Sequence, residues 1–198
     1  MILDIGIMRI GAGKNNIDFF QKYINIGYMK YETELEFVKK YPKILRDYRG
    51  DPMQTCMAFG IETDGDGWNN LLDKCMEKLQ HFCDLCTKNG SPIQVVATQI
   101  KSKFATLSFY YSGEGGSRID WDIIDDIISQ TERHSAQVCE VSGEYGRLCS
   151  KGGWYMTLCY EEARKLGYKA CDESTEAYWK EKDAKGEKND DHEELGTT

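Results

Sequence analysis

The sequence predicts an α+β fold in which several α-helices cover a small antiparallel β-sheet. The first observation is a long amphipathic helix from Trp68 to Cys86, where apolar residues recur at three- and four-residue steps. The second is a pair of β-rich runs, 93–100 and 104–111, which flank Lys101-Ser102-Lys103 and predict a hairpin near 93–111. Alternation in the second run places four residues on one face: Ala105, Leu107, Phe109 and Tyr111.

Further elements follow from start and stop signals. A helix begins near Met29, where Thr33-Glu34-Leu35-Glu36 fits a capping box. Residues 112–117 are rich in Gly and Ser and predict a flexible loop before a further helix. A short helix ends at Leu166-Gly167, since glycine suits a left-handed cap. In the helix after the loop, the helical period predicts that five residues face the core: Trp121, Ile124, Ile127, Ile128 and Thr131.

The length of 198 residues suits one domain. Residues 1–28 lack a clear period and are assigned to a leader or extension of uncertain structure. Residues 29–170 form the predicted single α+β domain. Residues 171–198 are charged, and we expect them to be partly helical and then disordered.

The amino-acid composition limits the classes of partner that the protein is expected to bind. A net charge of -8 argues against general nucleic-acid binding, which needs a basic face. No segment approaches the roughly 20 apolar residues of a membrane span. The N-terminus lacks a secretory pattern, so the eight cysteines are expected to be reduced thiols in a cytoplasmic protein.

The stretch from Glu62 to Asp73 has the spacing of a calcium loop, with glycine at the sharp turn. However, Asp73 is shorter than the usual last ligand, and the segment before the loop is a poor helix. The alternative is a turn in which Asp66 caps the following helix. We favour this turn, whose structural motif is Gly65, Asp66, Gly67 and Trp68.

Two cysteine patterns suggest metal or redox chemistry. Cys83-x-x-Cys86 extends the apolar stripe of its helix, so packing is favoured over a redox pair. The segment 139–162 would be a zinc knuckle if Ser142 were cysteine and Glu162 were histidine. Only Cys139 and Cys159 remain of its ligands. We therefore expect a zinc-free hairpin with no bound metal and no cofactor.

Three motifs support a resemblance: GDGW-x2-L at 65–71, Q-I-K-S-K-F-x2-L-x-F-Y at 99–110, and CE-x2-G followed by GGW-x3-LC at 139–159. Together they resemble a family of small uncharacterised bacteriophage and prophage proteins, over roughly residues 40–165. The chain departs from the pattern at Ser142 and Glu162, and at Ala105, where glycine is expected. The resemblance implies a phage origin and a host bacterial cytoplasm, but no activity.

The chain carries no G-x-S-x-G, HE-x2-H or complete P-loop motif, and its three histidines are scattered, so we lean against an enzyme. Basic and aromatic residues instead suggest binding of an anionic ligand, because Lys and Arg pair with phosphate and tyrosine stacks on bases. One candidate group is Lys101, Lys103, Tyr110, Tyr111 and Arg118. A second lies in the C-terminal hairpin and contains Arg147 and Trp154, with Lys151 beside them.

The leading hypothesis is a non-enzymatic antagonist of host antiviral defence, acting as a homo-oligomer. One version sequesters a nucleotide immune signal in a pocket of basic and aromatic residues, and a close variant binds a host defence protein. The alternative is a diverged zinc-ribbon module, a regulatory or host-takeover protein acting on nucleic acid. An enzyme that degrades a nucleotide is a third hypothesis.

Overall fold

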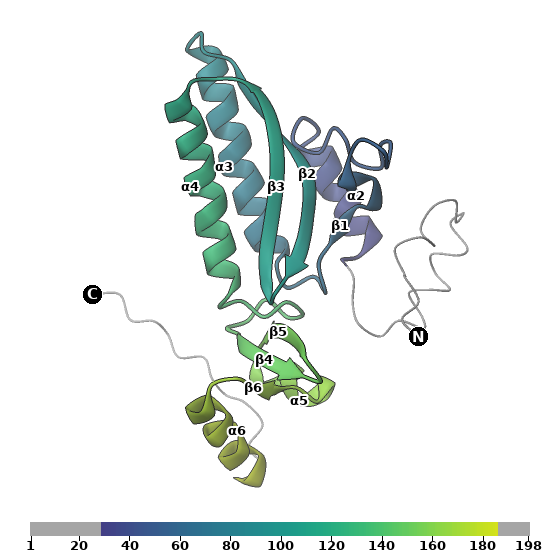
Figure 1. Ribbon diagram of the computed structural model, residues 1–198, viewed down its shortest axis with the longest axis vertical. Coiled ribbons are helices and arrows are strands. Elements are labelled where there is room, and N and C mark those ends of the chain that lie inside the picture. The colour runs from purple at the N-terminus through teal and green to yellow at the C-terminus, as the bar shows by residue number, and fades with distance from the viewer. Residues whose placement is uncertain (1–28, 186–198) are drawn as a thin grey trace.

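The computed structural model describes residues 29–185 (Figure 1). It confirms the α+β class, but with two small sheets instead of one. No helix between residues 29 and 185 is both long and apolar enough to cross a membrane. The elements in chain order are α2 (Tyr31–Lys40), η2 (Cys56–Phe59), β1 (Ile61–Glu62), α3 (Asn69–Lys88), β2 (Ile93–Lys103), β3 (Thr106–Gly115), α4 (Arg118–Ser135), β4 (Arg147–Lys151), β5 (Trp154–Leu158), α5 (Tyr160–Leu166), β6 (Lys169–Ala170) and α6 (Glu173–Lys185).

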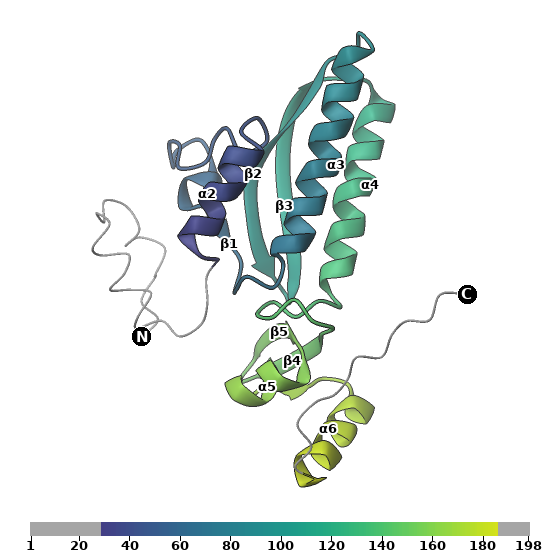
Figure 2. The same ribbon diagram turned by 180° about the vertical axis from the view of Figure 1, so that it is seen from behind.

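The first sheet has the strand order β1-β2-β3 and belongs to a larger module, residues 29–138. Its β2 and β3 form the predicted hairpin, whereas β1 adds in parallel and makes the sheet mixed. Helices α3 and α4 lie side by side along one face of the hairpin (Figures 1 and 2). Because α3 and the inward face of β3 follow their predicted periods, Leu72, Leu79, Leu107 and Phe109 are buried in one core.

The predicted ends of the hairpin need two corrections. The turn lies at Phe104-Ala105, not at 101–103, and both residues have positive φ values of 53° and 62°. Such a two-residue turn matches the twist of paired strands, and it leaves Lys101 and Lys103 within β2. The expected loop at 112–117 is also wrong, because β3 stays paired with β2 as far as Gly115.

Two predicted helix caps are wrong as well. Helix α2 begins at Tyr31, so Thr33 and Glu36 of the expected capping box lie within the helix, and no side chain caps its start. Helix α3 has Trp68 at its N-cap without a side-chain cap bond. The Asp66 carboxylate instead forms an ion pair with Lys30, 2.9 Å away. At Asp66 a tertiary partner thus competes successfully for the carboxylate.

The second sheet has the strand order β5-β4-β6 and belongs to a smaller module, residues 139–185. It lies beyond the hairpin turn, with α5 and α6 beside it (Figure 1). Helix α5 ends at Leu166, and Gly167 takes the predicted left-handed conformation. The module has its own hydrophobic core, to which these buried residues contribute: Cys139, Cys149, Met156, Leu158, Cys159, Ala163, Ala170 and Trp179.

A glutamate carboxylate accepts a backbone N–H on each outer strand of the two sheets. An outer strand with free N–H groups can pair with another chain, and inward-pointing charges oppose that pairing. The four bonds join Ile61 to Glu34 (3.3 Å), Phe109 to Glu132 (2.8 Å), Thr157 to Glu140 (2.8 Å) and Ala170 to Glu176 (3.0 Å). Association by strand addition is therefore disfavoured at these positions.

Candidate functional site

Three of the predicted binding residues meet on the outer face of the first sheet, opposite α3 and α4. Lys101 and Lys103 alternate with the core-facing Ile100 and Ser102 and so share this face with Tyr110. The Lys101 Nζ atom lies 5.6 Å from the centre of the Tyr110 ring. Lys103 Nζ donates a hydrogen bond of 3.3 Å to the Tyr110 hydroxyl. The result is two cations held against one exposed aromatic ring.

The hairpin turn extends this surface with an exposed apolar side chain. Phe104 is 82% exposed, and Lys103 Nζ lies 5.7 Å from its ring centre. We call Lys101, Lys103, Phe104 and Tyr110 the hairpin surface. A large exposed aromatic ring is typical of a contact surface.

The smaller module is held against the same turn. Thr157 Oγ1 donates a 2.8 Å hydrogen bond to the Ala105 carbonyl oxygen. Leu148 pairs with Thr157 across β4 and β5, and Tyr155 lies two positions along β5, so all three share one face. Leu148 and Tyr155 are 45% and 51% exposed. They add further apolar surface next to the hairpin surface.

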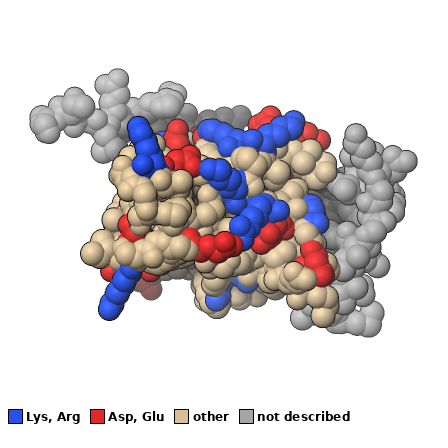
Figure 3. All heavy atoms as spheres, turned by 90° about the horizontal axis from the view of Figure 1, so that it is seen from above, with Lys and Arg blue, Asp and Glu red and all other residues tan. Residues whose placement is uncertain are grey.

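The other predicted residues of the first group lie elsewhere. Tyr111 faces α4, where its ring stacks on Trp121 at 6.1 Å and its hydroxyl donates to Asp125. Arg118 is the first residue of α4, at the opposite end of β3 from the hairpin turn. At that end of the molecule positive and negative side chains are interleaved (Figure 3). The five residues therefore do not line one pocket.

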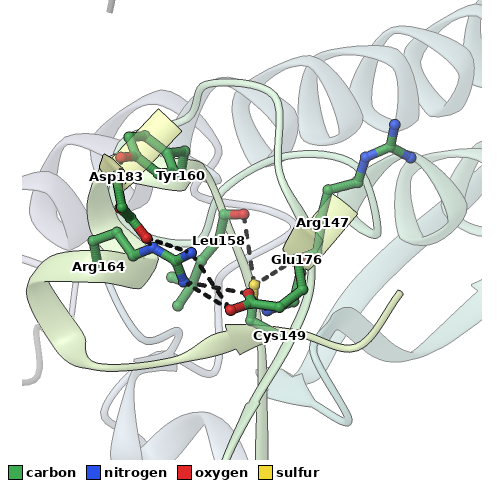
Figure 4. Close-up of polar contacts among 8 residues, drawn as sticks. Arg147, Cys149, Leu158, Tyr160, Arg164, Glu176 and Asp183 are labelled. Atoms are coloured by element: carbon green, nitrogen blue, oxygen red, sulfur yellow. Dashed lines mark hydrogen bonds and ion pairs between the residues drawn. The ribbon is translucent and has the colours of Figure 1, made fainter. Parts of the chain in front are cut away.

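The second predicted group is on the smaller module. The Arg147 guanidinium stacks on Tyr145, 4.8 Å from its ring centre, and the side chain extends away from the polar contacts around Cys149 (Figure 4). Trp154 begins β5 beside the Gly152-Gly153 turn and is 76% exposed. Both side chains are accessible, and neither joins the hairpin surface directly.

Arg164 holds α5 and α6 together in this module (Figure 4). Its guanidinium lies 2.9 Å from an Asp183 carboxylate oxygen and 3.3 Å from one of Glu176. The Tyr160 hydroxyl also donates to Asp183, at 2.7 Å. The Trp179 ring meets that of Tyr160 edge-on, 5.7 Å between centres, so α6 belongs to the folded module.

Glu140 lies where all three sequence motifs meet, and sequence reasoning missed it. Its carboxylate accepts hydrogen bonds from the Thr157 amide (2.8 Å) and the Ser102 hydroxyl (2.9 Å), while its carbonyl accepts one from Gly67 (3.0 Å). Burial, with Asp64 nearby, raises the pKa of Glu140 to about 8. The only signal in the sequence was its place within the CE-x2-G motif.

The GDGW motif is a close-packed joint between the modules. The Trp68 indole N–H donates a 2.8 Å hydrogen bond to the Val138 carbonyl, and its side chain is fully buried. A Cβ atom added to Gly67 would lie 2.0 Å from the Cys139 carbonyl oxygen. Glycine at position 67 is thus required by the close approach of the 138–143 backbone.

Three of the four zinc-knuckle positions, Cys139, Ser142 and Cys159, lie together, but their donors do not fit zinc. The Ser142 amide lies 3.5 Å from the Cys139 sulfur, and its hydroxyl lies 3.5 Å from the Cys159 sulfur. A hydrogen bond from the Cys159 thiol lowers the pKa of Cys139. Serine is a poor zinc ligand, and the Glu162 carboxylate is already paired with Lys165 at 2.7 Å. Between residues 29 and 185, no group of three or more His, Cys, Asp and Glu side chains is arranged to hold a metal ion.

An open depression of about 360 Å³ lies between β3 and the C-terminal end of α4. None of the predicted binding residues lines it. Its walls are Thr106, Leu107, Ser108, Glu132, Arg133 and Ala136.

Comparison with known proteins identifies no relative. No protein-family model, curated protein or solved structure matches the chain.

Proposed function

We propose that this chain is a non-enzymatic phage protein that binds and antagonises a component of host antiviral defence in the bacterial cytoplasm. The observation that supports binding is the hairpin surface, where two lysines and two exposed aromatic rings lie together. The phage origin rests on the motif resemblance, and the defence target follows from that origin because small phage proteins without catalytic motifs often act by binding a host component.

A host defence protein is the partner that this geometry favours. The hairpin surface is open, and the exposed Leu148 and Tyr155 lie next to it. Apolar anchors surrounded by charge suit a protein patch that is apolar at its centre and acidic at its rim. A nucleotide signal would instead use Lys101 and Lys103 for phosphate and Tyr110 for stacking.

The homo-oligomer expected from the sequence stays part of the proposal. Because glutamate carboxylates accept hydrogen bonds from N–H groups of the outer strands, subunits would associate through side-chain surfaces instead of paired strands.

A phage-plating assay tests this function. The chain is expressed in bacteria that carry a defence system, and plaques are counted with the wild type and with Lys101→Glu/Lys103→Glu. We expect the wild type to restore plating on at least one system and the variant to lose that effect, because its surface would repel an acidic partner. The control Lys39→Glu/Lys74→Glu makes the same charge change at exposed helical positions and should retain the effect.

Calorimetry separates the two versions. Purified chain is titrated with cyclic and ADP-ribose-type nucleotides. No heat from any of them, together with loss of plating in the hairpin variant alone, supports a protein partner. Stoichiometric nucleotide binding supports sequestration, and turnover of the nucleotide would contradict a non-enzymatic role. Equal plating by wild type and hairpin variant would remove this surface from the proposal.

The second candidate function is a diverged zinc-ribbon module acting on nucleic acid. It is supported by the convergence of Cys139, Ser142 and Cys159. Metal analysis of the purified chain tests it, since substantially less than one zinc per chain removes this candidate.

A further inference from the structure

Two thiols lie on either side of one serine in the smaller module. The Cys139 sulfur is 3.5 Å from the Ser142 amide nitrogen, and the Cys159 sulfur is 3.5 Å from the Ser142 hydroxyl. Cys139 lies in the segment after α4, and Cys159 is the N-cap of α5. Neither cysteine is in a disulfide. The fold thus brings together two reduced sulfurs that are distant in the sequence.

The lack of two further ligands directs these sulfurs to other chemistry. Zinc would engage both as thiolates, but Ser142 and Glu162 do not complete its tetrahedral site. We propose that Cys139 and Cys159 form an oxidation-sensitive dithiol, which a peroxide converts into a disulfide that ties the 139–146 segment to the start of α5. This modification site is independent of the binding function proposed above.

The pair is sheltered but close to the surface. Cys139 is fully buried and Cys159 is 6% exposed, whereas Ser142 between them is exposed. Both sulfurs therefore contact a residue of the surface directly. The nearby Cys149 is also buried, but its thiol is directed to backbone carbonyl oxygens of Arg147 (3.2 Å) and Leu158 (4.0 Å) (Figure 4). The geometry favours Cys159 as the partner of Cys139.

The reaction is a two-electron oxidation. One thiol, as its thiolate, attacks a peroxide oxygen; an S–O bond forms, the O–O bond breaks, and the departing hydroxide takes up a proton. The second thiolate attacks the resulting sulfenic acid, so that an S–S bond forms and hydroxide leaves from sulfur. In sum, two thiols and one hydrogen peroxide give one disulfide and two waters. The sulfurs are oxidised and the peroxide is reduced.

Peptide mapping tests the proposal because trypsin separates the three cysteines. Cleavage after Arg133, Arg147, Lys151 and Arg164 places Cys139 in 134–147, Cys149 in 148–151 and Cys159 in 152–164. The full, reduced chain is treated with hydrogen peroxide at stoichiometric amounts. Remaining thiols are alkylated, and the digest is analysed by mass spectrometry without reductant. We expect a linked pair of 134–147 and 152–164, two hydrogens lighter than the sum of both peptides and separated by dithiothreitol.

Two cysteine variants and the alternative oxidation products distinguish the proposed disulfide from other outcomes. Cys159→Ser should abolish the linked pair, whereas the matched control Cys149→Ser, at another buried cysteine of the module, should retain it. The proposal is overturned by linkage of 134–147 to 148–151, or by sulfinic acid on Cys139 without a link. It is also overturned if both thiols stay reduced while the exposed Cys56 and Cys171 are oxidised. The wild-type map decides among these without relying on the folding of any variant.

Discussion

The two modules of this protein are stabilised by different means. In the larger module, many aliphatic and aromatic side chains are buried in one core between α3, α4 and the β2–β3 hairpin. The smaller module has fewer buried apolar residues, three of them cysteines, and adds the Arg164 ion pairs and the Glu140 hydrogen bonds. Small cores bury too little surface to be stable by packing alone, so specific polar contacts or cross-links matter more there.

The largest expected effect comes from completing the zinc knuckle of the smaller module. In Ser142→Cys/Glu162→His, a third thiol is placed between the two that already flank position 142, and a histidine follows Cys159 at the knuckle spacing, so we expect one zinc per chain. Structural zinc in comparable fingers contributes an apparent ~10–16 kcal/mol of binding free energy at pH 7. Zinc titration against a chromophoric chelator measures the stoichiometry. The control Ser142→Cys/Glu161→His has the same composition but a displaced histidine, and equal zinc uptake by both variants would refute the convergence.

Two tryptophans differ in burial: Trp68 lies in the joint between the modules, whereas Trp154 lies on the surface of the smaller module. Trp68→Ala removes a fully buried ring and the donor to Val138, and should cost about 3–5 kcal/mol of unfolding free energy. Trp154→Ala removes a ring that is 76% exposed and should stay within about 0.5 kcal/mol. Urea unfolding measures both values, and similar losses would contradict the assigned joint.

Removing the Arg164 charge should weaken the smaller module alone. Arg164→Met leaves Glu176 and Asp183 without their cation and should cost about 2 kcal/mol, less than a fully buried pair because Asp183 is partly exposed. Lys165→Met breaks an exposed pair with Glu162 and should cost under about 0.5 kcal/mol. Hydrogen exchange should increase in 147–185 for the first variant only. Equal increases in α3 would show that the modules unfold as one unit.

A change in pH dependence is also expected at the joint between the modules. The pKa of Glu140 is raised from 4.5 to about 8 in the folded chain, so the folded state holds a proton that the unfolded state releases. Its contribution to stability is present below pH 4.5 and decreases as the pH rises towards 8. The slope is at most about 1.4 kcal/mol per pH unit.

Glu140→Gln mimics the protonated carboxyl and should flatten this decline. Unfolding free energies of the wild type and the variant are compared between pH 5 and pH 8. The control Glu132→Gln alters a similar bond on β3, at a less buried position. A decline that is as steep in Glu140→Gln as in the wild type would show that Glu140 is not its source.

Elements with strong periodicity were predictable from the sequence. Helix α3 and the β2–β3 hairpin lie in the predicted parts of the chain, although the turn and the end of the hairpin differ, because burial on one face imposes the 3.6- and 2-residue periods. By contrast, α6 buries Trp179 together with the polar Glu176 and Lys182, so its sequence carries no apolar stripe that predicts its packing. The glutamates that accept hydrogen bonds from the outer strands were also missed, because each bond joins a carboxylate to a backbone N–H of another element.

In the candidate sites, too, the sequence determined some features and the tertiary structure decided others. The sequence alone determined the residue types: lysines alternating along a strand, an aromatic run, and two cysteines with the spacing of an incomplete zinc knuckle. The tertiary structure decided which of them meet. It moved the hairpin turn to Phe104-Ala105, turned Tyr111 towards α4 and placed Arg118 at the far end of the sheet. Local periodicity determines the direction of a side chain along its own element, whereas pairing register and packing between elements decide its neighbours.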